Sequence, residues 1–352
     1  MPLAVKDVTA GETGTVGTQR RPVTMRDVAV AAGVSPKTVS NVVNDYVHVR
    51  PETRTHVQRY VEELGYRPQA VGRQLRRGRT GAIALAVPHV DMPYFADLAA
   101  LLVSAAREHG LTVVVEQTDG NIERERQVAA GSPVRFADAL IFSPLSMPPS
   151  ELAAPRHDTP MVLLGEHGAA AQADRVDIDS TAIGRSAATH LAVSGRRRIA
   201  AIGHQQDRAK SAMEQRILGY TQALRAADLP VEHSLIRTVP EWDRQDGSDA
   251  VDALLAEHPD VDAVFAANDV LAIGALSALH RHGRRVPDDV ALVGVDDVPE
   301  SRFTTPALTT VAIDRVFVVE SALEMIISRL AEPDLPPRSV TTPHRLVVRA
   351  SS

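Results

Sequence analysis

The sequence predicts an N-terminal all-α helix-turn-helix domain followed by an α/β domain of two lobes. Three observations predict this fold class: two short amphipathic helices between residues 23 and 44, a basic run over residues 72–79, and buried strands that alternate with helices from residue 80 onward. The chain has 352 residues, enough for two or three domains. It has no cysteine, so we expect neither disulfides nor thiolate metal sites, and no other metal or cofactor site is predicted.

Charge is divided unevenly along the chain. Residues 1–80 contain 13 Lys and Arg and 7 Asp and Glu, whereas the rest contains 25 basic and 37 acidic residues. A basic N-terminal segment followed by an acidic remainder is typical of a protein whose N-terminal part binds nucleic-acid phosphates, although uneven surface charge is also common in other proteins. Residues 1–21 are rich in Gly and Thr and have no apolar period, so we expect a disordered leader.

The first expected helix carries clear start signals. Thr24 is placed to cap the helix, and Asp27 stands in the capping-box position three residues later. Val28 and residues 31–32 give the helix an apolar face. A short turn at residues 33–34 then leads into a second helix.

The second expected helix has the layout of a DNA recognition helix. Ser35 caps it, and Pro36 fits its first position, where a missing N–H has no consequence. One side is apolar and can pack against the first helix: Val39, Val42 and Val43. The other side carries polar groups near the helix N-terminus, where base-reading side chains enter the major groove: Lys37, Thr38, Ser40 and Asn41. A small helical hairpin without a DNA role is the alternative.

These polar groups differ in what they can contact. Lys37 can donate to guanine, and Asn41 can pair with adenine. Thr38, Ser40 and Asn44 are better placed for phosphates or for holding the helix. Base preference should therefore depend mainly on Lys37 and Asn41.

A third helix is expected over residues 51–64, with Gly65 as its C-cap, and the basic segment follows. Together these segments resemble the LacI/GalR family of bacterial transcription regulators. The blocks that carry the resemblance stand in a fixed order: VTMRDVAVAAGVSPKTVSNVVN, PETR, ELGYRP and AVGRQL. The resemblance continues along nearly all of the chain, from Pro22 to Arg349.

The resemblance implies roles for individual residues of the helix-turn-helix. The positions that match Pro36, Lys37 and Asn41 read base edges in the family, and Pro36 can offer only an apolar contact. Arg50 stands where the family usually has a capping Ser. We therefore expect a weaker start to the third helix and an additional phosphate contact.

The resemblance also implies that residues 69–75 form a hinge helix where two subunits meet over the centre of the operator. Leu75 matches the residue that wedges into the minor groove, with ordinary linker packing as the alternative. Gly72 and Gln69 replace better helix-forming and capping residues, so the free hinge should be less ordered. The expected DNA-binding residues are Thr24, Ser35, Pro36, Lys37, Thr38, Ser40, Asn41, Asn44, Arg50, Ala70, Gly72, Arg73 and Leu75.

Beyond residue 80 the pattern predicts two successive lobes with parallel sheets. Strands are expected at residues 82–87, 111–115, 139–142, 161–164, 199–202, 234–239, 263–266 and 290–293. Helices are expected at residues 96–109, 122–130, 181–194, 212–226, 247–257 and 270–282. The resemblance implies a periplasmic-binding-protein-like bilobal domain whose chain crosses between lobes near residues 190, 312 and 340.

The expected domain organisation follows from these segments. It comprises a leader (1–21), a helix-turn-helix domain (22–67), a hinge helix and linker (68–79) and an effector-binding and dimerisation domain (80–352). In the last, lobe 1 spans about 80–190 and 313–339, and lobe 2 about 191–312 and 340–352. No heptad segment follows residue 349, so we expect dimers rather than tail-linked tetramers.

Short blocks matching the family mark an effector cleft between the lobes. Tyr94 and Phe95 match an aromatic pair over the cleft, with core packing as the alternative for Phe95. Asp179 matches a carboxylate that accepts bonds from effector hydroxyls, a role compatible with helix capping. Arg216 begins the block R-x-x-G-[FY], and its guanidinium group can hold effector hydroxyls there. The alternative is an arginine on the surface of a helix without a ligand role.

Further cleft candidates follow expected strands. Trp242, the only tryptophan, lies in a polar loop and can offer a stacking face to a sugar. Asn268 and Asp296 stand at strand ends, where open α/β sheets bind ligands, whereas Asp269 is expected to cap the next helix. This set favours a neutral polyhydroxy effector, a sugar or nucleoside, but Lys210 leaves a phosphorylated or anionic ligand open.

The chain is thus predicted to be a dimeric, effector-controlled transcription regulator, a repressor, whose partners are double-stranded operator DNA and a small molecule. An enzyme is disfavoured, because no GxGxxG, P-loop, HExxH or GxSxG motif occurs. A secreted sugar-binding protein is disfavoured because no signal peptide is evident. No apolar stretch is long enough to span a membrane, so a cytoplasmic protein is expected.

Overall fold

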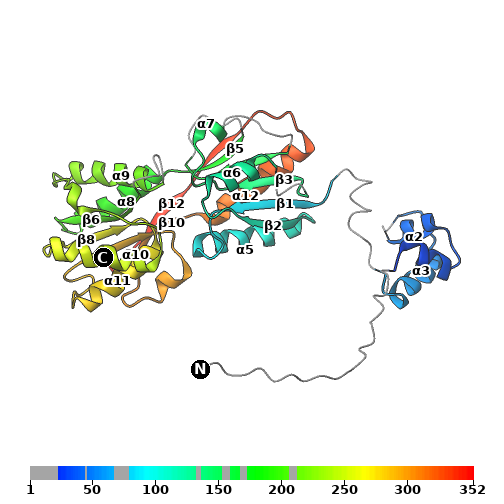
Figure 1. The fold of residues 1–352 in the computed structure, drawn as a ribbon, viewed down its shortest axis with the longest axis horizontal. Coiled ribbons are helices and arrows are strands. Elements are labelled where there is room, and N and C mark those ends of the chain that lie inside the picture. Colours follow the sequence, from blue (N-terminus) through cyan, green and yellow to red (C-terminus); the bar gives the residue numbers. More distant parts are fainter. Residues whose placement is uncertain are drawn as a thin grey trace, which may run out of the picture. The chain divides into compact units, whose positions relative to one another are not determined.

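A computed structural model describes residues 23–43, 46–66, 79–131, 136–152, 159–166, 173–205 and 212–352. The chain divides into two compact units, residues 1–78 and residues 79–352 (Figure 1). The expected leader (1–21) and nearly all of the expected hinge segment (68–79) lie outside the described residues.

The first unit contains a helix-turn-helix. It is built from α1 (Met25–Ala31), α2 (Pro36–Val43) and α3 (Pro51–Glu63). The predicted capping box is confirmed, because Thr24 accepts from the Asp27 amide while the Asp27 carboxylate accepts from the Thr24 amide at 2.7 Å. The expectation that residues 31–32 share the apolar face of α1 is half wrong: residue 31 is exposed, and Ala29 is buried instead.

The three helices are joined by one small core and by polar contacts from α3. Val28, Val39 and Val57 are fully buried and meet at its centre. The Arg54 guanidinium donates to the carbonyls of Val42 and Tyr46, 3.4 and 2.8 Å away, so α3 satisfies acceptors at the end of the recognition helix. The α3 start has no side-chain cap at Arg50, as expected.

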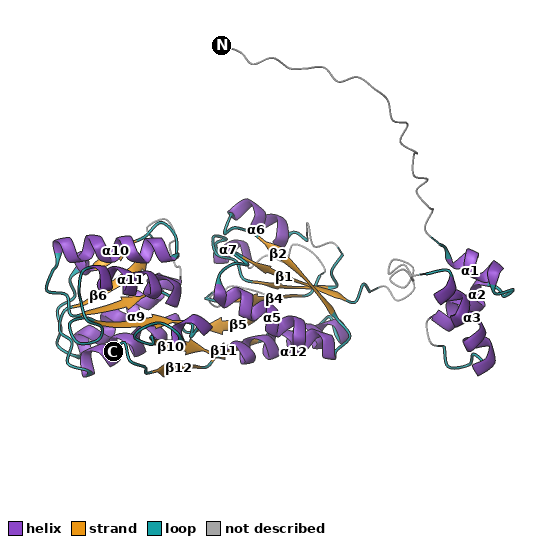
Figure 2. Cartoon of the chain, turned by 90° about the horizontal axis from the view of Figure 1, so that it is seen from below, coloured by secondary structure: helices purple, strands orange, loops and turns teal. Residues whose placement is uncertain are grey.

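Lobe 1 of the second unit is a six-stranded sheet in the order β11-β5-β4-β3-β1-β2. Its strands are β1 (Ala82–Val87), β2 (Thr112–Gln117), β3 (Ala139–Phe142), β4 (Met161–Leu164), β5 (Asp174–Ile178) and β11 (Ser339–Thr342). Its helices are α5 (Pro93–Glu108), α6 (Ile122–Ala129), α7 (Pro149–Leu152) and α12 (Arg315–Ala331). Helices α5 and α12 cover one face, and α6 and α7 the other (Figure 2).

Lobe 2 repeats this design with the sheet order β12-β10-β9-β8-β6-β7. Its strands are β6 (Ile199–His204), β7 (Ile236–Thr238), β8 (Ala263–Ala266), β9 (Ala291–Val295), β10 (Thr309–Ile313) and β12 (His344–Val347). The α-helices are α8 (Ser180–Val193), α9 (Ala212–Ala226), α10 (Arg244–Glu257) and α11 (Asp269–Arg281), and two short 3-10 turns are η2 (His233–Leu235) and η3 (Pro299–Arg302). The pair α8–α9 covers one face of the sheet and α10–α11 the other (Figures 1 and 2).

The chain crosses between the lobes three times. The crossings fall after β5, after β10 and between β11 and β12. The first crossing lies near residue 179, not near 190 as expected, because α8 packs against α9 and the strands of lobe 2. The other two, near residues 314 and 343, lie close to the expected positions.

Helices α8 and α9 approach each other backbone to backbone at two glycines. A Cβ on Gly184 would lie 2.0 Å from the Arg216 carbonyl oxygen, and a Cβ on Gly219 would lie 1.9 Å from that of Thr181. Neither contact is possible, so only glycine permits this spacing. Because Arg216 and Gly219 share one turn of α9, the glycine contact also sets where the arginine lies.

We expect Gly219→Ala to lower the free energy of unfolding of the second unit by about 3 kcal/mol, since the added Cβ meets a backbone oxygen that cannot rotate away. The control is Gly283→Ala. Gly283 has a φ of +65° with open space around its missing Cβ, so only about 1 kcal/mol of backbone strain is expected. Urea unfolding of both variants measures the difference. Equal losses would contradict the close helix contact.

Candidate functional site

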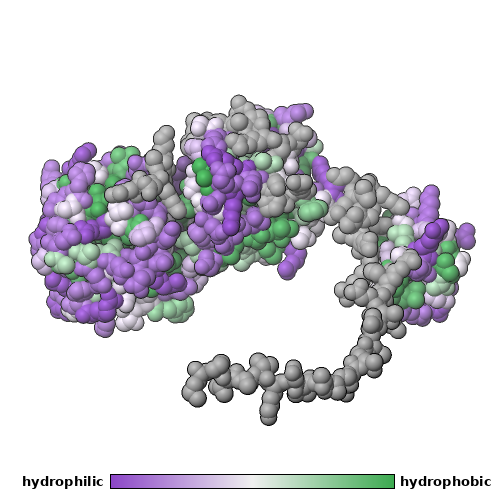
Figure 3. Space-filling model, in the orientation of Figure 1, coloured by the Kyte–Doolittle hydropathy of each residue, from purple (hydrophilic) through white to green (hydrophobic). Residues whose placement is uncertain are grey.

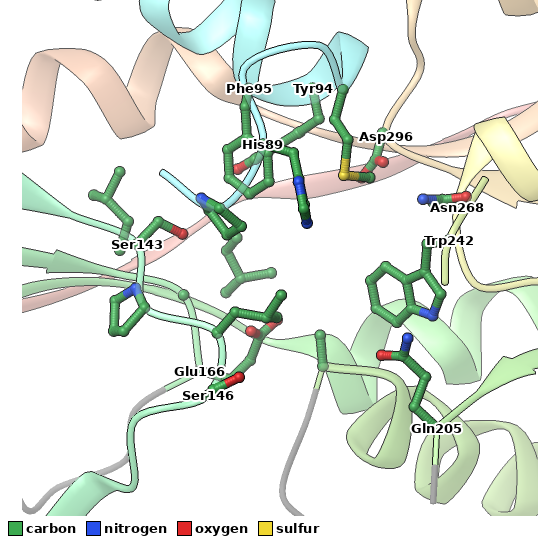
Figure 4. A pocket seen from close by; sticks show the side chains of 18 of the residues that line it. His89, Tyr94, Phe95, Ser143, Ser146, Glu166, Gln205, Trp242, Asn268 and Asp296 are labelled. Carbon is green, nitrogen blue, oxygen red and sulfur yellow. The ribbon is translucent and has the colours of Figure 1, made fainter. Parts of the chain in front are cut away.

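The two sheets present their carboxyl-terminal strand ends to one cleft. A cavity of about 710 Å³ lies there and is lined by residues of both lobes (Figure 4). His89, Ser143 and Glu166 follow strands β1, β3 and β4 of lobe 1, and Gln205 and Asn268 follow β6 and β8 of lobe 2. Open parallel α/β sheets bind ligands at this edge, so the cavity is the candidate effector site.

Arg216 and Trp242 form one part of the lobe 2 wall. The Arg216 guanidinium is buried, donates to the Ala267 carbonyl and lies with its Cζ 5.8 Å from the centroid of the Trp242 ring. The Trp242 Nε1 donates to the Gly203 carbonyl at 2.8 Å. This bond points the indole nitrogen away from the cavity and leaves the ring at its edge (Figure 4).

The Gly203 backbone that holds Trp242 has a special conformation. Gly203 has a φ of +116°, and a Cβ there would lie 2.4 Å from the Ala267 Cβ. The pairing of β6 with β7 shifts register between Ile202 and His204. A local irregularity of strand β6, which only glycine tolerates, therefore orients the stacking face of the cavity.

Asn268 lines the cavity as predicted, but the expected capping role of Asp269 is wrong. Asn268, not Asp269, caps α11, with its Oδ1 accepting from the Leu271 amide at 2.8 Å. Its Nδ2 is buried without a partner and is directed toward the cavity (Figure 4). The Asp269 carboxylate is buried behind the cleft and accepts from the Ser301 and Thr310 hydroxyls and the Val298 amide.

Asp296 stands at the end of β9 in an unusual setting. Its φ is +109°, and only 7% of the residue is exposed. Burial raises the pKa of Asp296 to about 7, partly opposed by the Arg216 charge and reinforced by Asp269. A strained, buried carboxyl group in a cleft is a common feature of functional sites.

The lobe 1 wall begins with the predicted aromatic pair. Tyr94 and Phe95 pack edge to face with ring centroids 5.2 Å apart. Tyr94 packs against the core of lobe 2, although it belongs to α5 of lobe 1. Burial raises the pKa of the Tyr94 hydroxyl, so the group stays neutral.

The structure brings together most of the predicted effector residues: Tyr94, Phe95, Arg216, Trp242, Asn268 and Asp296. Asp179 is the exception, since it is exposed, caps α8 through the Ala182 amide and does not line the cavity. Lys210 lies outside the described residues. Lining residues missed from the sequence include His89, Glu166 and Gln205, whose position after predicted strands was the one available signal.

The expected DNA-reading face lies on the exposed side of α2. Pro36 and Lys37 are exposed, and Asn41 is half-buried. The Ser35 hydroxyl accepts from the Thr38 amide at 3.1 Å and pairs with its hydroxyl, so both residues shape the helix start.

The remaining DNA-binding predictions have mixed outcomes. Thr24 lies half-buried with its hydroxyl directed to Asp27, whereas Arg50 is exposed. Ser40 is only 2% exposed, so a direct phosphate contact is wrong and its alternative role in holding the helix applies. Four hinge residues and one helix-end residue lie outside the described residues: Ala70, Gly72, Arg73, Leu75 and Asn44.

Comparison with known proteins identifies the family. Residues 24–69 match the lacI family of bacterial regulatory proteins, and residues 188–352 match a periplasmic binding protein-like domain. The ribose operon repressor of Halalkalibacterium halodurans is 30% identical over 94% of this chain and 97% of its own length. The chain belongs to the LacI family of bacterial regulatory proteins.

Solved structures of LacI-family proteins share the fold. A complex of the regulator CelR with cellobiose is 32% identical, with a TM-score of 0.69, and covers 94% of this chain and 100% of that one. The lac repressor dimer bound to operator and the anti-inducer ONPF is 24% identical, with a TM-score of 0.82, and covers 94% and 99%. The expected fold class is therefore confirmed.

Membership of the LacI family makes the chain a DNA-binding transcription regulator and not an enzyme. None of the helices in the described part of the chain combines the length and apolar character that a membrane span requires.

The raised pKa of Asp296 predicts a pH-dependent cost of its charge. The folded state favours the neutral carboxyl group, because its pKa is higher there than in the unfolded chain. Protonation of Asp296 therefore stabilises the fold fully below about pH 4, and this contribution to the free energy of unfolding is lost as the pH rises through 7. Asp296→Asn stays neutral, so its free energy of unfolding relative to the wild type should rise by roughly 2–4 kcal/mol between about pH 4 and pH 8. Chemical unfolding at both pH values measures this, with the acidic measurement as the control. A difference independent of pH would contradict the buried, uncompensated carboxylate.

Proposed function

We propose that this LacI-family regulator is a repressor that binds a palindromic operator as a homodimer under the control of a small polyhydroxy effector, a sugar or nucleoside, in the cleft between the lobes. The observation that carries the proposal is the presence in one chain of an exposed recognition-helix face and a cleft rich in hydrogen-bonding groups. Binding to DNA places the protein in the cytoplasm, at the nucleoid.

On the DNA side, α2 lies in the major groove with Lys37 and Asn41 at base edges. Pro36 makes an apolar contact, and Arg50 reaches a phosphate from the start of α3. The hinge residues Ala70, Gly72, Arg73 and Leu75 form the minor-groove contacts at the operator centre.

The dimer is supported by an apolar patch on lobe 1. Val103 of α5 is 38% exposed, and Val114 and Val115 of the edge strand β2 are 47% and 40% exposed. Figure 3 shows apolar atoms gathered over α5 on this side of the lobe. Exposed apolar side chains beside an unpaired strand edge favour association with a second subunit.

A contact at the crossing between the lobes can couple the cleft to that patch. Arg315, at the start of α12, donates to the Asp296 carbonyl and, at 3.1 Å, to the Asp297 carbonyl. Its Nη2 also lies 3.5 Å from the Asp97 carboxylate of α5. A ligand that shifts Asp296 therefore moves α5 through Arg315, and α5 carries part of the dimer patch. A change in how lobe 1 of one subunit packs against lobe 1 of the other then changes the spacing of the two hinge segments.

Selection from random DNA duplexes tests the operator model. We expect an inverted repeat, and Lys37→Ala or Asn41→Ala should relax base preference at one position per half-site by roughly 1–3 kcal/mol. Gln58→Ala is the control, because Gln58 is exposed on α3 and its side chain donates to Glu62 of the same helix. Single half-sites or direct repeats would contradict the dimer, and unchanged preference in both variants would contradict the recognition-helix assignment.

If the Arg315 contact couples the cleft to the dimer patch, its removal should weaken the effect of effector on operator binding while each ligand still binds. Arg315→Gln should keep operator affinity and effector affinity within about threefold of the wild type but weaken the effect of effector on operator binding about tenfold. Effector binding is followed by the fluorescence of Trp242 against sugars, sugar phosphates and nucleosides, and operator binding by anisotropy. The control Arg107→Gln removes an exposed charge from the other end of α5. A full response in Arg315→Gln would exclude this route of coupling.

A further inference from the structure

The two walls of the cleft differ in chemistry. The lobe 2 wall is polar and presents Arg216, Asn268, Asp296 and Gln205 beside the Trp242 ring. The lobe 1 wall is mainly apolar, with Met92, Phe95, Leu98, Leu145, Met147 and Leu164 among its lining side chains. Figure 4 shows the labelled residues of the two lobes facing each other across open space. A ligand that fills the cleft must therefore have a polar part and a less polar part.

Among the described lining residues, the buried side-chain donors without a hydrogen-bond partner belong to the polar wall. The Asn268 Nδ2 and the Arg216 Nε are buried and have no partner. Leaving a buried donor unpaired is unfavourable, and the Asn268 Nδ2 is directed toward the cavity, so this position favours a ligand with an acceptor oxygen. The Asp296 carboxyl group stands nearby as an acceptor for hydroxyl hydrogens. Alternating donors and acceptors beside an aromatic face suit one polyhydroxylated sugar ring.

The charge of the cleft disfavours anions. Glu166 and Glu241 line it, whereas Arg216 is the sole Arg or Lys among the described lining residues. The Arg216 charge already acts on Asp296 and lies against the Trp242 ring. A phosphate group brought into this cavity would face an excess of carboxylates, and like charges placed close together repel each other.

The size of the cavity exceeds one sugar ring. At about 30 Å³ per water, the cavity of about 710 Å³ holds roughly two dozen waters, whereas a hexose has only about a dozen heavy atoms. A single ring on the polar wall would leave the apolar wall hydrated. A second ring would cover that wall and remove its apolar surface from water.

Resting on the proposed function of the cleft, we propose that the effector is a neutral glycoside of two rings. The polyhydroxylated ring lies on the lobe 2 wall against Trp242, Asn268 and Arg216. The second ring, joined through the glycosidic bond, lies against the apolar wall, where Ser143 and Ser146 offer hydroxyls for its polar edge. Disaccharides and nucleosides share this chemistry, whereas monosaccharides, sugar phosphates, nucleotides and free bases do not.

Calorimetric titration of the full chain with matched compounds tests the proposal. The two-ring probes are cellobiose, maltose, lactose, xylobiose, adenosine, uridine and cytidine; the matched probes are glucose, galactose, xylose, ribose, adenine, glucose 6-phosphate and the nucleoside monophosphates. We expect at least one two-ring neutral compound to bind at least tenfold more tightly than its one-ring part and its phosphorylated counterpart. Whether that compound is a disaccharide or a nucleoside distinguishes the two sources.

A one-ring or phosphorylated compound that binds as tightly as every two-ring probe overturns the proposal. So does the failure of all two-ring probes to bind at about 1 mM. Operator binding without effector is measured on the same preparations. If operator binding is lost, the proposed function is contradicted. If operator binding persists while either of the two ligand results is obtained, only the proposed class of ligand is contradicted.

Two variants locate the second ring. Leu145→Gln, on the half-buried part of the apolar wall, should weaken the two-ring compound about tenfold and leave its one-ring part unchanged. Asn268→Ala should weaken both. The control Val193→Gln changes an exposed valine at the end of α8, outside the cleft and outside the dimer patch. Thermal unfolding confirms that each variant folds, and equal losses of both ligands in Leu145→Gln would contradict the position of the second ring.

Discussion

The contact of helix backbones at glycine is the constraint on which the lobe 2 wall depends. Gly184 and Gly219 bring α8 against α9, and Gly247 and Gly274 bring α10 against α11 in the same manner, with hypothetical Cβ positions 1.8 to 2.1 Å from carbonyl oxygens. The first pair sets the position of Arg216. Because the second pair sets α11, whose N-cap is Asn268, both unused donors of the cavity owe their places to helix spacing that any larger residue would prevent.

Side chains near the crossings form contacts between the two lobes beside the cavity. Arg315 begins α12 directly after one crossing, yet its guanidinium contacts carbonyls of lobe 2 and a carboxylate of lobe 1. Tyr94 makes the converse contact, because it belongs to lobe 1 and packs on the core of lobe 2. Each lobe thus contacts the other through side chains beside the cavity.

The sequence predicted the elements with strong periodicity well and the site only in part. Strands β3, β4 and β8 and helix α9 have the expected bounds, because buried apolar runs and clear amphipathic periods leave little choice. The cap of α11 was assigned to Asp269 instead of Asn268, since either residue at a strand-to-helix junction can cap the helix and only the structure shows which one does. The apolar wall of lobe 1 was missed because loop residues such as Leu145 and Met147 show no period.

The order of the crossings limits how such chains can recombine. Lobe 1 needs α12 and β11, which follow all but one strand of lobe 2, so no single cut in the chain releases a complete lobe. The boundary between residues 78 and 79, in contrast, separates two units that are each built from continuous chain. Gene fusion at that boundary can pair one operator specificity with another signal in a single event, whereas exchanging half a cleft would need several coordinated breaks.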